Sequence, residues 1–342
     1  MNKLYGNSPM ISEVKKARFK PRPIIAILIF LGVFSLLQTL SSLPVMIYGM
    51  PKLMKFISEY SMDIISGVKE YDYAQIMEES ITFTESLMND NIGMLLMLFG
   101  TIIPLIGMIL YGKIVDKRSM NSFGFYKKRA VPKYLLGMVV GFVLITSSIM
   151  VLYALDFYSF KRVENCNYVM IVLYFFAYLI QGAEEEIALR GFLMIGLNGR
   201  RTSIIHSVMM SSLVFTLLHA MNPGMTLLGL FNIFLFAVFA ALYMLESGSI
   251  WGVCAIHSVW NFVQGNIFGI EVSGTASAAS IFITEEKGSS LISGGTVGLE
   301  GSIICAAIML IAIATILVKS MYRYKNTPED QRYIPEVDNN YL

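Results

Sequence analysis

The chain has 342 residues, of which 55% are apolar and 15% charged, and its mean hydropathy is +0.62. This composition excludes an ordinary soluble domain and predicts a polytopic membrane protein in a lipid bilayer. The net charge is only +2, and the sequence has no basic, aromatic-rich stretch, so we expect no nucleic-acid partner. The three cysteines are widely spaced and form neither a metal motif nor a disulfide framework.

Apolar stretches of membrane-spanning length recur along the chain. They cover residues 24–48, 92–112, 134–155, 168–197, 203–222, 225–245, 249–269 and 301–318. Helices are the only economical form for such stretches in lipid. The first is too long for a signal-peptide core and lacks a small-residue cleavage site, so we expect it to be retained. The sequence therefore predicts an all-α polytopic membrane protein of about eight transmembrane helices, with any functional site inside the helix bundle.

The stretches divide the chain into six expected segments. These are a basic N-terminal arm (1–23), the first two spanning helices with an external loop at 51–91 (24–119), a core of five helices (120–269), an external loop (270–300), the eighth helix (301–318) and a tail (319–342). The 51–91 loop has room for a surface amphipathic helix. The 270–300 loop is rich in Gly, Ser and Thr, which is typical of a flexible connection.

Positive charge predicts the orientation. Lysines and arginines concentrate in segments that fall on one side when eight crossings are counted: the N-terminal arm, 113–133, the turn 198–202 and 319–325. Cytoplasmic loops carry such an excess. We therefore expect a plasma-membrane protein with both termini in the cytoplasm.

A charged cluster follows the apolar run 168–180. It contains Glu184, Glu185, Glu186 and Arg190, which are costly at membrane depth unless they pair, meet water or do chemistry. Glu186 and Arg190 are four residues apart and can pair along one helix face. Glu185 points about 100° away from Glu186 and is free to face a cavity. We expect Glu184 to be a solvated and dispensable neighbour.

Two of the three histidines lie well inside apolar stretches. His206 lies next to the basic turn and is expected at the interface, whereas His219 and His257 are deeper. A lone histidine in a membrane helix most often hydrogen-bonds a neighbouring helix, but two histidines beside a carboxylate cluster favour a functional site. Glu185 and His219 are both seventeen residues from position 202, which in a helical hairpin places both about 25 Å from the turn.

Helical spacing also predicts which side chains share a face. Phe215 lies one turn before His219, and His257 lies one turn before Asn261. The imidazole and carboxamide of the second pair offer two donors aimed at one point, as an oxyanion requires. We expect this pair to face the same cavity as Glu185 and His219, in the inner half of the membrane.

These groups suit hydrolysis by more than one route. A carboxylate near an imidazole can take a proton from water, which then attacks an amide carbonyl. Alternatively, Glu185, His219 and His257 form a zinc site with two histidines and one glutamate. The helical His-Glu-x-x-His zinc motif is absent, but the spacing does not exclude a metal.

The spaced motifs resemble a known family. Glu185-Glu186-x-x-x-Arg190, Phe215-x-x-x-His219 and His257-x-x-x-Asn261 look like the three motifs of the CPBP family. This family comprises the type II CAAX prenyl endopeptidases and the similar bacteriocin-processing and self-immunity proteins. The resemblance covers roughly residues 120–265, the larger part of the predicted core, and its specificity comes from finding all three motifs in order.

The resemblance implies an intramembrane endopeptidase that cleaves a peptide or membrane-protein substrate near the cytoplasmic interface without a cofactor. It implies that Glu185 activates water with help from His219, and that His257 and Asn261 hold the oxyanion. Glu186 and Arg190 would brace the motif helix, with Phe215 packing beside them. Zinc at Glu185, His219 and His257 remains the alternative.

Two other functions compete with this one. A catalytically silent partner could use the same fold to modulate another membrane protein, and a proton-coupled transporter could use buried Glu and His as a relay. The complete set of motif residues favours the peptidase, and the sequence has no symmetrical half-helices typical of transporters. Substrate prenylation, bacteriocin immunity and peptide maturation all remain open.

Overall fold

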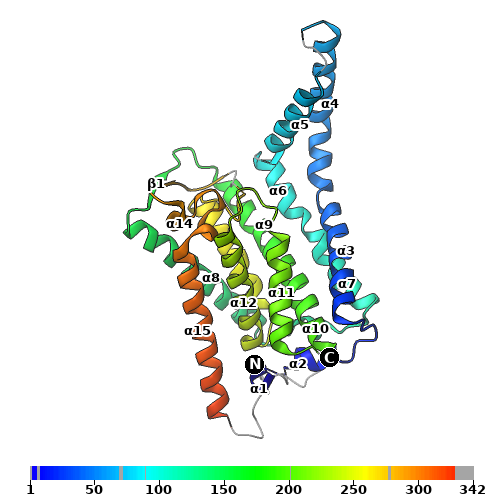
Figure 1. The fold of residues 1–342 in the computed structure, drawn as a ribbon, viewed down its shortest axis with the longest axis vertical. Helices are drawn as coiled ribbons and strands as arrows, with labels where there is room; N and C mark the ends of the chain where they lie inside the picture. The colour runs from blue at the N-terminus through cyan, green and yellow to red at the C-terminus, as the bar shows by residue number, and fades with distance from the viewer. Residues whose placement is uncertain are drawn as a thin grey trace.

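The computed structural model describes residues 2–5, 8–68, 72–88, 90–200, 202–275 and 279–327, and it is almost entirely helical (Figure 1). The α-helices are α1 (Asn2–Tyr5), α2 (Pro9–Val14), α3 (Pro23–Ser41), α4 (Leu43–Ile65), α5 (Tyr73–Met88), α6 (Asn91–Gly100), α7 (Ile102–Ile114), α8 (Ala130–Ala154), α9 (Tyr168–Glu186), α10 (Ile195–Gly199), α11 (Ile204–Leu218), α12 (Leu227–Ser247), α13 (Trp251–Phe262), α14 (Ser290–Ser293) and α15 (Ile303–Asn326). Most of the predicted tail, 328–342, lies outside the described residues.

Shorter elements complete the fold. Two π-helices, η2 (Ile187–Met194) and η3 (Val263–Ile267), continue α9 and α13. The 3-10 turns are η1 (Met120–Phe123), η4 (Gly295–Val297) and η5 (Leu299–Gly301). The strands β1 (Tyr158–Arg162) and β2 (Phe282–Glu286) pair antiparallel, with Tyr158 opposite Glu286.

The helices confirm an all-α membrane protein. Within the described residues, five helical segments are long and apolar enough to cross a membrane: α3, the consecutive α6 and α7, α8, α12 and α15. Three further helices carry the motif residues, but α9 ends in three glutamates, and α11 and α13 have only 15 and 12 residues. The expected count of eight spans therefore stays a prediction.

Helix α13 is the central helix of the bundle and packs against α8 and α9. Glycines permit this close approach. A Cβ on Gly137 of α8 would lie 2.2 Å from the carbonyl oxygen of Gly252, and a Cβ on Gly182 of α9 would lie 2.6 Å from the amide nitrogen of Ser258. Small residues let membrane helices pack backbone to backbone. The polar residues of α9 and α13 are thereby brought into contact.

The expected 51–91 loop is mostly a helical hairpin. Helix α4 continues to Ile65 and α5 returns beside it, with the rings of Phe56 and Phe83 stacked at 5.3 Å. Figure 1 shows this hairpin projecting beyond the rest of the bundle. The sequence leaves room for a surface helix, but spacing alone does not reveal that two helices would pair.

The described part of 270–301 packs against the rest of the molecule at several points. Ile270, Val297 and Leu299 are buried, and β2 holds the segment to β1. Its glycines serve close chain contacts: Gly298 has φ +81°, and a Cβ there would lie 1.9 Å from the carbonyl oxygen of Glu271. These glycines thus serve close packing in the described part of the segment, while its flexibility and external position stay predictions.

The basic segments meet at one end of the bundle. In Figure 1, α1, α2, α10 and the C-terminal end of α15 lie at the lower end, whereas β1, α14 and the tip of the α4–α5 hairpin lie at the other. At the lower end, Arg200 pairs with Asp116 at 3.4 Å. Basic segments that are far apart in the sequence thus lie at the same end of the bundle. The orientation of that end in the membrane stays a prediction.

Candidate active site

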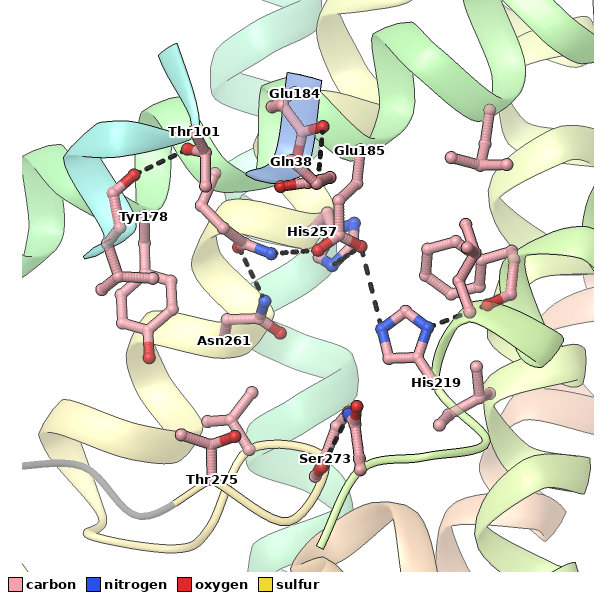
Figure 2. A pocket seen from close by; sticks show the side chains of 18 of the residues that line it. Gln38, Thr101, Tyr178, Glu184, Glu185, His219, His257, Asn261, Ser273 and Thr275 are labelled. Atoms are coloured by element: carbon pink, nitrogen blue, oxygen red, sulfur yellow. Dashed lines mark hydrogen bonds and ion pairs between the residues drawn. The ribbon is translucent and has the colours of Figure 1, made fainter. Parts of the chain in front are cut away.

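Five of the seven motif residues, all except Glu186 and Arg190, line one cavity of about 640 Å³ inside the bundle. Its wall includes Glu185 from α9, His219 at the end of α11, and His257 and Asn261 from α13 (Figure 2). Phe215 also lines it, one turn before His219. The structure therefore brings together the side chains that the three spaced motifs single out.

Glu185 lies between the two histidines. Its Oε2 is 3.8 Å from Nε2 of His257 and 4.0 Å from Nε2 of His219. These distances are slightly too long for direct hydrogen bonds and short enough for one water to bridge the groups. Both histidines therefore present a ring nitrogen to the same carboxylate oxygen in the cavity wall.

The backbone fixes the tautomer of His219. Its Nδ1 lies 2.8 Å from the carbonyl oxygen of Phe215, one turn earlier on α11. A carbonyl oxygen only accepts, so Nδ1 carries the proton and donates it. The neutral ring then presents an unprotonated Nε2 to Glu185. Phe215 thus supports the site through its carbonyl, and its ring lies 4.3 Å from the guanidinium of Arg190.

A buried carboxylate fixes His257 in the same way. Nδ1 of His257 lies 2.9 Å from Oε1 of Glu186, which also pairs with Arg190 at 3.0 Å. Glu186 and Arg190 are 0% and 1% exposed. The expected Glu186–Arg190 pair is present. The contact with His257 was not predicted, because it joins residues on different helices.

Three acceptors therefore converge when both rings are neutral. Oε2 of Glu185 and the two Nε2 atoms carry lone pairs and no proton. Such a cluster is stable only if a proton donor or a cation lies among them. Water fits, because it can donate two hydrogen bonds. For the oxyanion role, His257 would have to carry a second proton on Nε2.

Gln181 links the two sides of the site, and the motifs did not identify it. Asn261 Nδ2 donates to Gln181 Oε1 at 3.0 Å, and Gln181 Nε2 donates to Glu185 Oε1. The carboxylate can only accept, so the orientations of both amides are fixed by this chain. The available signal was spacing, since Gln181 lies one helical turn before Glu185.

Glu184 is buried in the cavity wall, contrary to the expectation of a solvated side chain. It is 1% exposed, and its Oε1 accepts a hydrogen bond from Gln38 Nε2 of α3 at 3.2 Å (Figure 2). The reason is that α3 covers this face of α9. Helical spacing could not show that, because residues 38 and 184 are far apart in the chain.

The chemical types of the three side chains Glu185, His219 and His257 suit a metal ion, but the distances between their ligand atoms suit it less well. Two imidazole nitrogens and a carboxylate, with each Nδ1 held by an acceptor, are what zinc sites use. Zinc bonds of about 2.0–2.1 Å would place tetrahedral ligand atoms about 3.3 Å apart, whereas the separations here are 3.8 and 4.0 Å. Within the described residues, no group of three His, Cys, Asp or Glu is placed to hold a metal.

Both helices that carry the central residues pass into π-helix beside the site. Helix α9 becomes η2 after Glu186, and α13 becomes η3 after Phe262. The buried guanidinium of Arg118 donates to the carbonyl oxygens of Gly191 and Phe192 in η2, at 2.7 and 2.9 Å. Such widened turns recur at functional sites.

The cavity wall also includes chain outside the three motifs. The end of α3 and the segment 94–101 form one side, and Asn222, Ser273 and Glu300 form another. The last three come from the turn after α11, from the segment after η3 and from η5. The spacing had predicted a site toward the basic, cytoplasmic end, but it could not show which loops fold over the cavity.

Comparison with known proteins agrees with the motifs. The family model described as type II CAAX prenyl endopeptidase Rce1-like matches residues 167–263, which include all three motifs. No curated protein and no solved structure gives a significant match. The matched family is a family of membrane proteases, and the match supports membership of this chain in the CPBP family.

Proposed function

We propose that this protein is an intramembrane endopeptidase that hydrolyses a peptide bond of a peptide or membrane-associated protein inside the cavity. The observation that carries the proposal is that Glu185 Oε2 lies 4.0 Å from Nε2 of His219 and 3.8 Å from Nε2 of His257. A carboxylate oxygen and the Nε2 of a neutral His219 offer two acceptors to a water molecule that is to lose a proton. The Rce1-like match supports the same class of reaction.

The reaction follows from these positions. A water donates hydrogen bonds to Glu185 and to one histidine, and its oxygen attacks the substrate carbonyl carbon. Glu185 takes the proton released as the carbon–oxygen bond forms. When the carbon–nitrogen bond breaks, Glu185 returns that proton to the leaving amine. The protein thus ends each cycle in its starting protonation state.

The oxyanion needs donors on the other side of the carbonyl carbon. Asn261 uses one N–H on Gln181 and has a second available. His257 supplies another donor if it is protonated while Glu186 holds its Nδ1. Donors fixed in advance stabilise the charge that develops on the oxygen. Prenyl-tail cleavage, peptide maturation and bacteriocin immunity are each compatible with this chemistry.

The decisive experiment compares Glu185→Gln with the wild type. The purified proteins are assayed on a quenched fluorescent peptide, with thermal melts of both. We expect cleavage to fall by at least about a hundredfold, the lower range for general acid–base catalysis, with little change in melting temperature. Glu164→Gln is the matched control, because Glu164 is exposed and does not line the cavity.

Full activity in Glu185→Gln would show that Glu185 is not the base and would contradict the proposed mechanism. A wild-type protein that cleaves no peptide would instead favour the silent-partner function.

A further inference from the structure

We propose that Glu184 forms a subsite for a lysine or arginine side chain of the substrate, within two residues of the bond that is cut. The proposal rests on the peptidase function and names the chemical class of its substrate. It begins from a feature that the three motifs do not explain: a buried carboxylate beside the central glutamate, in the same cavity wall.

Apart from His219 and His257, the Asp, Glu, Lys, Arg and His side chains that line the cavity are all glutamates. The described lining residues include the carboxylates Glu184, Glu185 and Glu300, and they include no lysine or arginine. Away from bulk water these charges act strongly on a bound peptide. A substrate with a free carboxylate near the scissile bond is repelled, whereas a cationic side chain is attracted.

Glu184 also has an unused acceptor. Its Oε1 accepts from Gln38 Nε2 at 3.2 Å, whereas its Oε2 has no hydrogen-bond partner although the residue is only 1% exposed. The Ser41 hydroxyl lies close to Gln38, at 2.7 Å from its backbone oxygen and 3.2 Å from its Oε1, and its one proton can serve either oxygen. A buried carboxylate oxygen without a donor is costly, and a ligand that brings N–H donors removes that cost.

A second wall of the cavity also carries a hydrogen-bond acceptor that no donor meets. Asn232 is 1% exposed, and its Nδ2 donates to the carbonyl oxygens of Glu300 and Ser302 at 2.6 and 2.8 Å. Because carbonyl oxygens only accept, the amide cannot be reversed, and Oδ1 is left without a partner. The cavity therefore offers acceptors on two sides, and a ligand rich in donors complements it.

The distance along the substrate follows from chain geometry. Glu184 and Glu185 are adjacent on α9, so their Cα atoms are about 3.8 Å apart. An extended peptide advances about 3.3–3.6 Å per residue. When the scissile carbonyl is at Glu185, the side chain that reaches Glu184 belongs to a residue close to that carbonyl. Figure 2 shows both carboxylates beside the same part of the cavity.

The test uses quenched fluorescent peptides of one apolar sequence, in which each position near the cleaved bond is in turn lysine, norleucine or glutamate. Norleucine keeps the aliphatic chain of lysine and removes the amine. At one position we expect the wild type to prefer lysine over norleucine by roughly tenfold or more in kcat/KM, and to cleave the glutamate peptide least. In Glu184→Gln we expect the ratio of kcat/KM for the lysine peptide to that for the norleucine peptide to fall to about one. In Glu164→Gln we expect this ratio to stay as in the wild type.

Binding separates this inference from the peptidase function. Fluorescence anisotropy measures the affinity of the same peptides, labelled but unquenched, without any need for cleavage. Preferential binding of the lysine peptide that depends on Glu184, with no cleavage of any peptide, supports the subsite and contradicts the peptidase. Two results contradict the subsite while supporting the peptidase function. One is cleavage with an unchanged lysine-to-norleucine ratio of kcat/KM in Glu184→Gln, and the other is cleavage of the glutamate peptide as fast as or faster than that of the lysine peptide. If Glu184→Gln does not fold, the proposal is judged from the wild-type peptide series alone. A glutamate peptide cleaved as well as or better than the lysine peptide then overturns it.

Discussion

Adjacent glutamates of α9 meet very different surroundings. Glu186 is fully buried between Arg190 and His257, whereas Glu185 faces the cavity and Gln181. Glu186 does not line the cavity, so it is not placed to take a proton from a water there. A carboxylate that faces a small polar space is the better acceptor of a proton from water. One residue along the helix thus separates a structural from a chemical role.

We expect Glu186→Gln to be strongly destabilising. It leaves the Arg190 guanidinium buried without its counter-charge, and breaking a buried ion pair costs about 3–5 kcal/mol. Thermal melts of the purified variant measure the loss. The double variant Glu186→Gln, Arg190→Gln should recover part of the stability, because it removes the buried charge. A Glu186→Gln protein as stable as the wild type would mean that the pair contributes little.

We expect activity to survive rigorous chelation. A water can donate to Glu185 and to one of the two histidines, and the separations at Glu185 are wider than tetrahedral zinc requires. The measurement is peptide cleavage after dialysis against a strong chelator, alongside metal analysis of the protein. If cleavage is lost and one equivalent of zinc restores it, then Glu185, His219 and His257 are metal ligands.

Sequence spacing predicted contacts within helices better than contacts between them. The Glu186–Arg190 pair and the shared face of His257 and Asn261 follow from the helical period, which any α-helix obeys. The Glu186–His257 and Gln38–Glu184 contacts depend on how α3, α9 and α13 cross. That crossing is set by packing over the whole bundle, so the burial of Glu184 could not be read from its neighbours in the chain.

Among the elements, the segment 270–301 contributes most beyond the motifs. Glu300 in η5 accepts from Gln264 Nε2 at 2.6 Å and from the backbone N–H of Ser273 at 3.4 Å. Asn222, in the turn after His219, donates to the carbonyl oxygen of Ser273 at 3.0 Å. The segment is therefore tied both to the end of α13 and to the turn that carries His219.

Stability should fall with rising pH through Glu300. Burial raises the pKa of Glu300 above its usual value, although the Gln264 hydrogen bond lowers it in part. The folded state then holds this proton to a higher pH than the unfolded state does. The contribution of Glu300 to the free energy of unfolding is therefore largest below the pKa that it has in the unfolded state. It is lost as the pH rises through the pKa that Glu300 has in the folded state.

The measurement compares thermal melts of wild type and Glu300→Gln from pH 4 to 8. We expect the melting temperature of the wild type to decline more steeply over this range than that of the variant, which cannot titrate at this position. Parallel curves would show that Glu300 does not contribute to the pH dependence. Glu164→Gln serves again as the exposed control.

For the whole molecule, the clustering of basic segments predicts which end faces the cytoplasm. We expect Asp72→Cys and Ser289→Cys, both exposed, to react with a membrane-impermeant maleimide on intact cells. Lys127→Cys at the basic end should react only after permeabilisation. A Cys166→Ser background removes the partly exposed natural thiol, since Cys254 and Cys305 are buried. The opposite pattern would reverse the orientation.

The orientation also bears on the side from which a substrate would reach the proposed site. Ser273 and Glu300 line the cavity, and they lie in the described part of 270–301, as Ser289 does. Labelling of Ser289→Cys on intact cells would therefore place the segment that carries this wall of the cavity on the outside. The same labelling experiment thus also informs the side from which a peptide would enter.

The π-helices η2 and η3 also have a consequence for how the chain tolerates changes in length. A π turn holds more residues than an α turn, so one deletion within 187–194 or 263–267 would let the helix tighten to regular α geometry. Because the tightened turn absorbs the missing residue, the helical residues on its two sides keep nearly the same faces toward the bundle. A deletion in a regular α-helix such as α8 has no extra residue to give up, and it rotates the residues beyond it by about 100°. Single-residue deletions in η2 and η3 should therefore disturb the bundle less than deletions elsewhere in its helices.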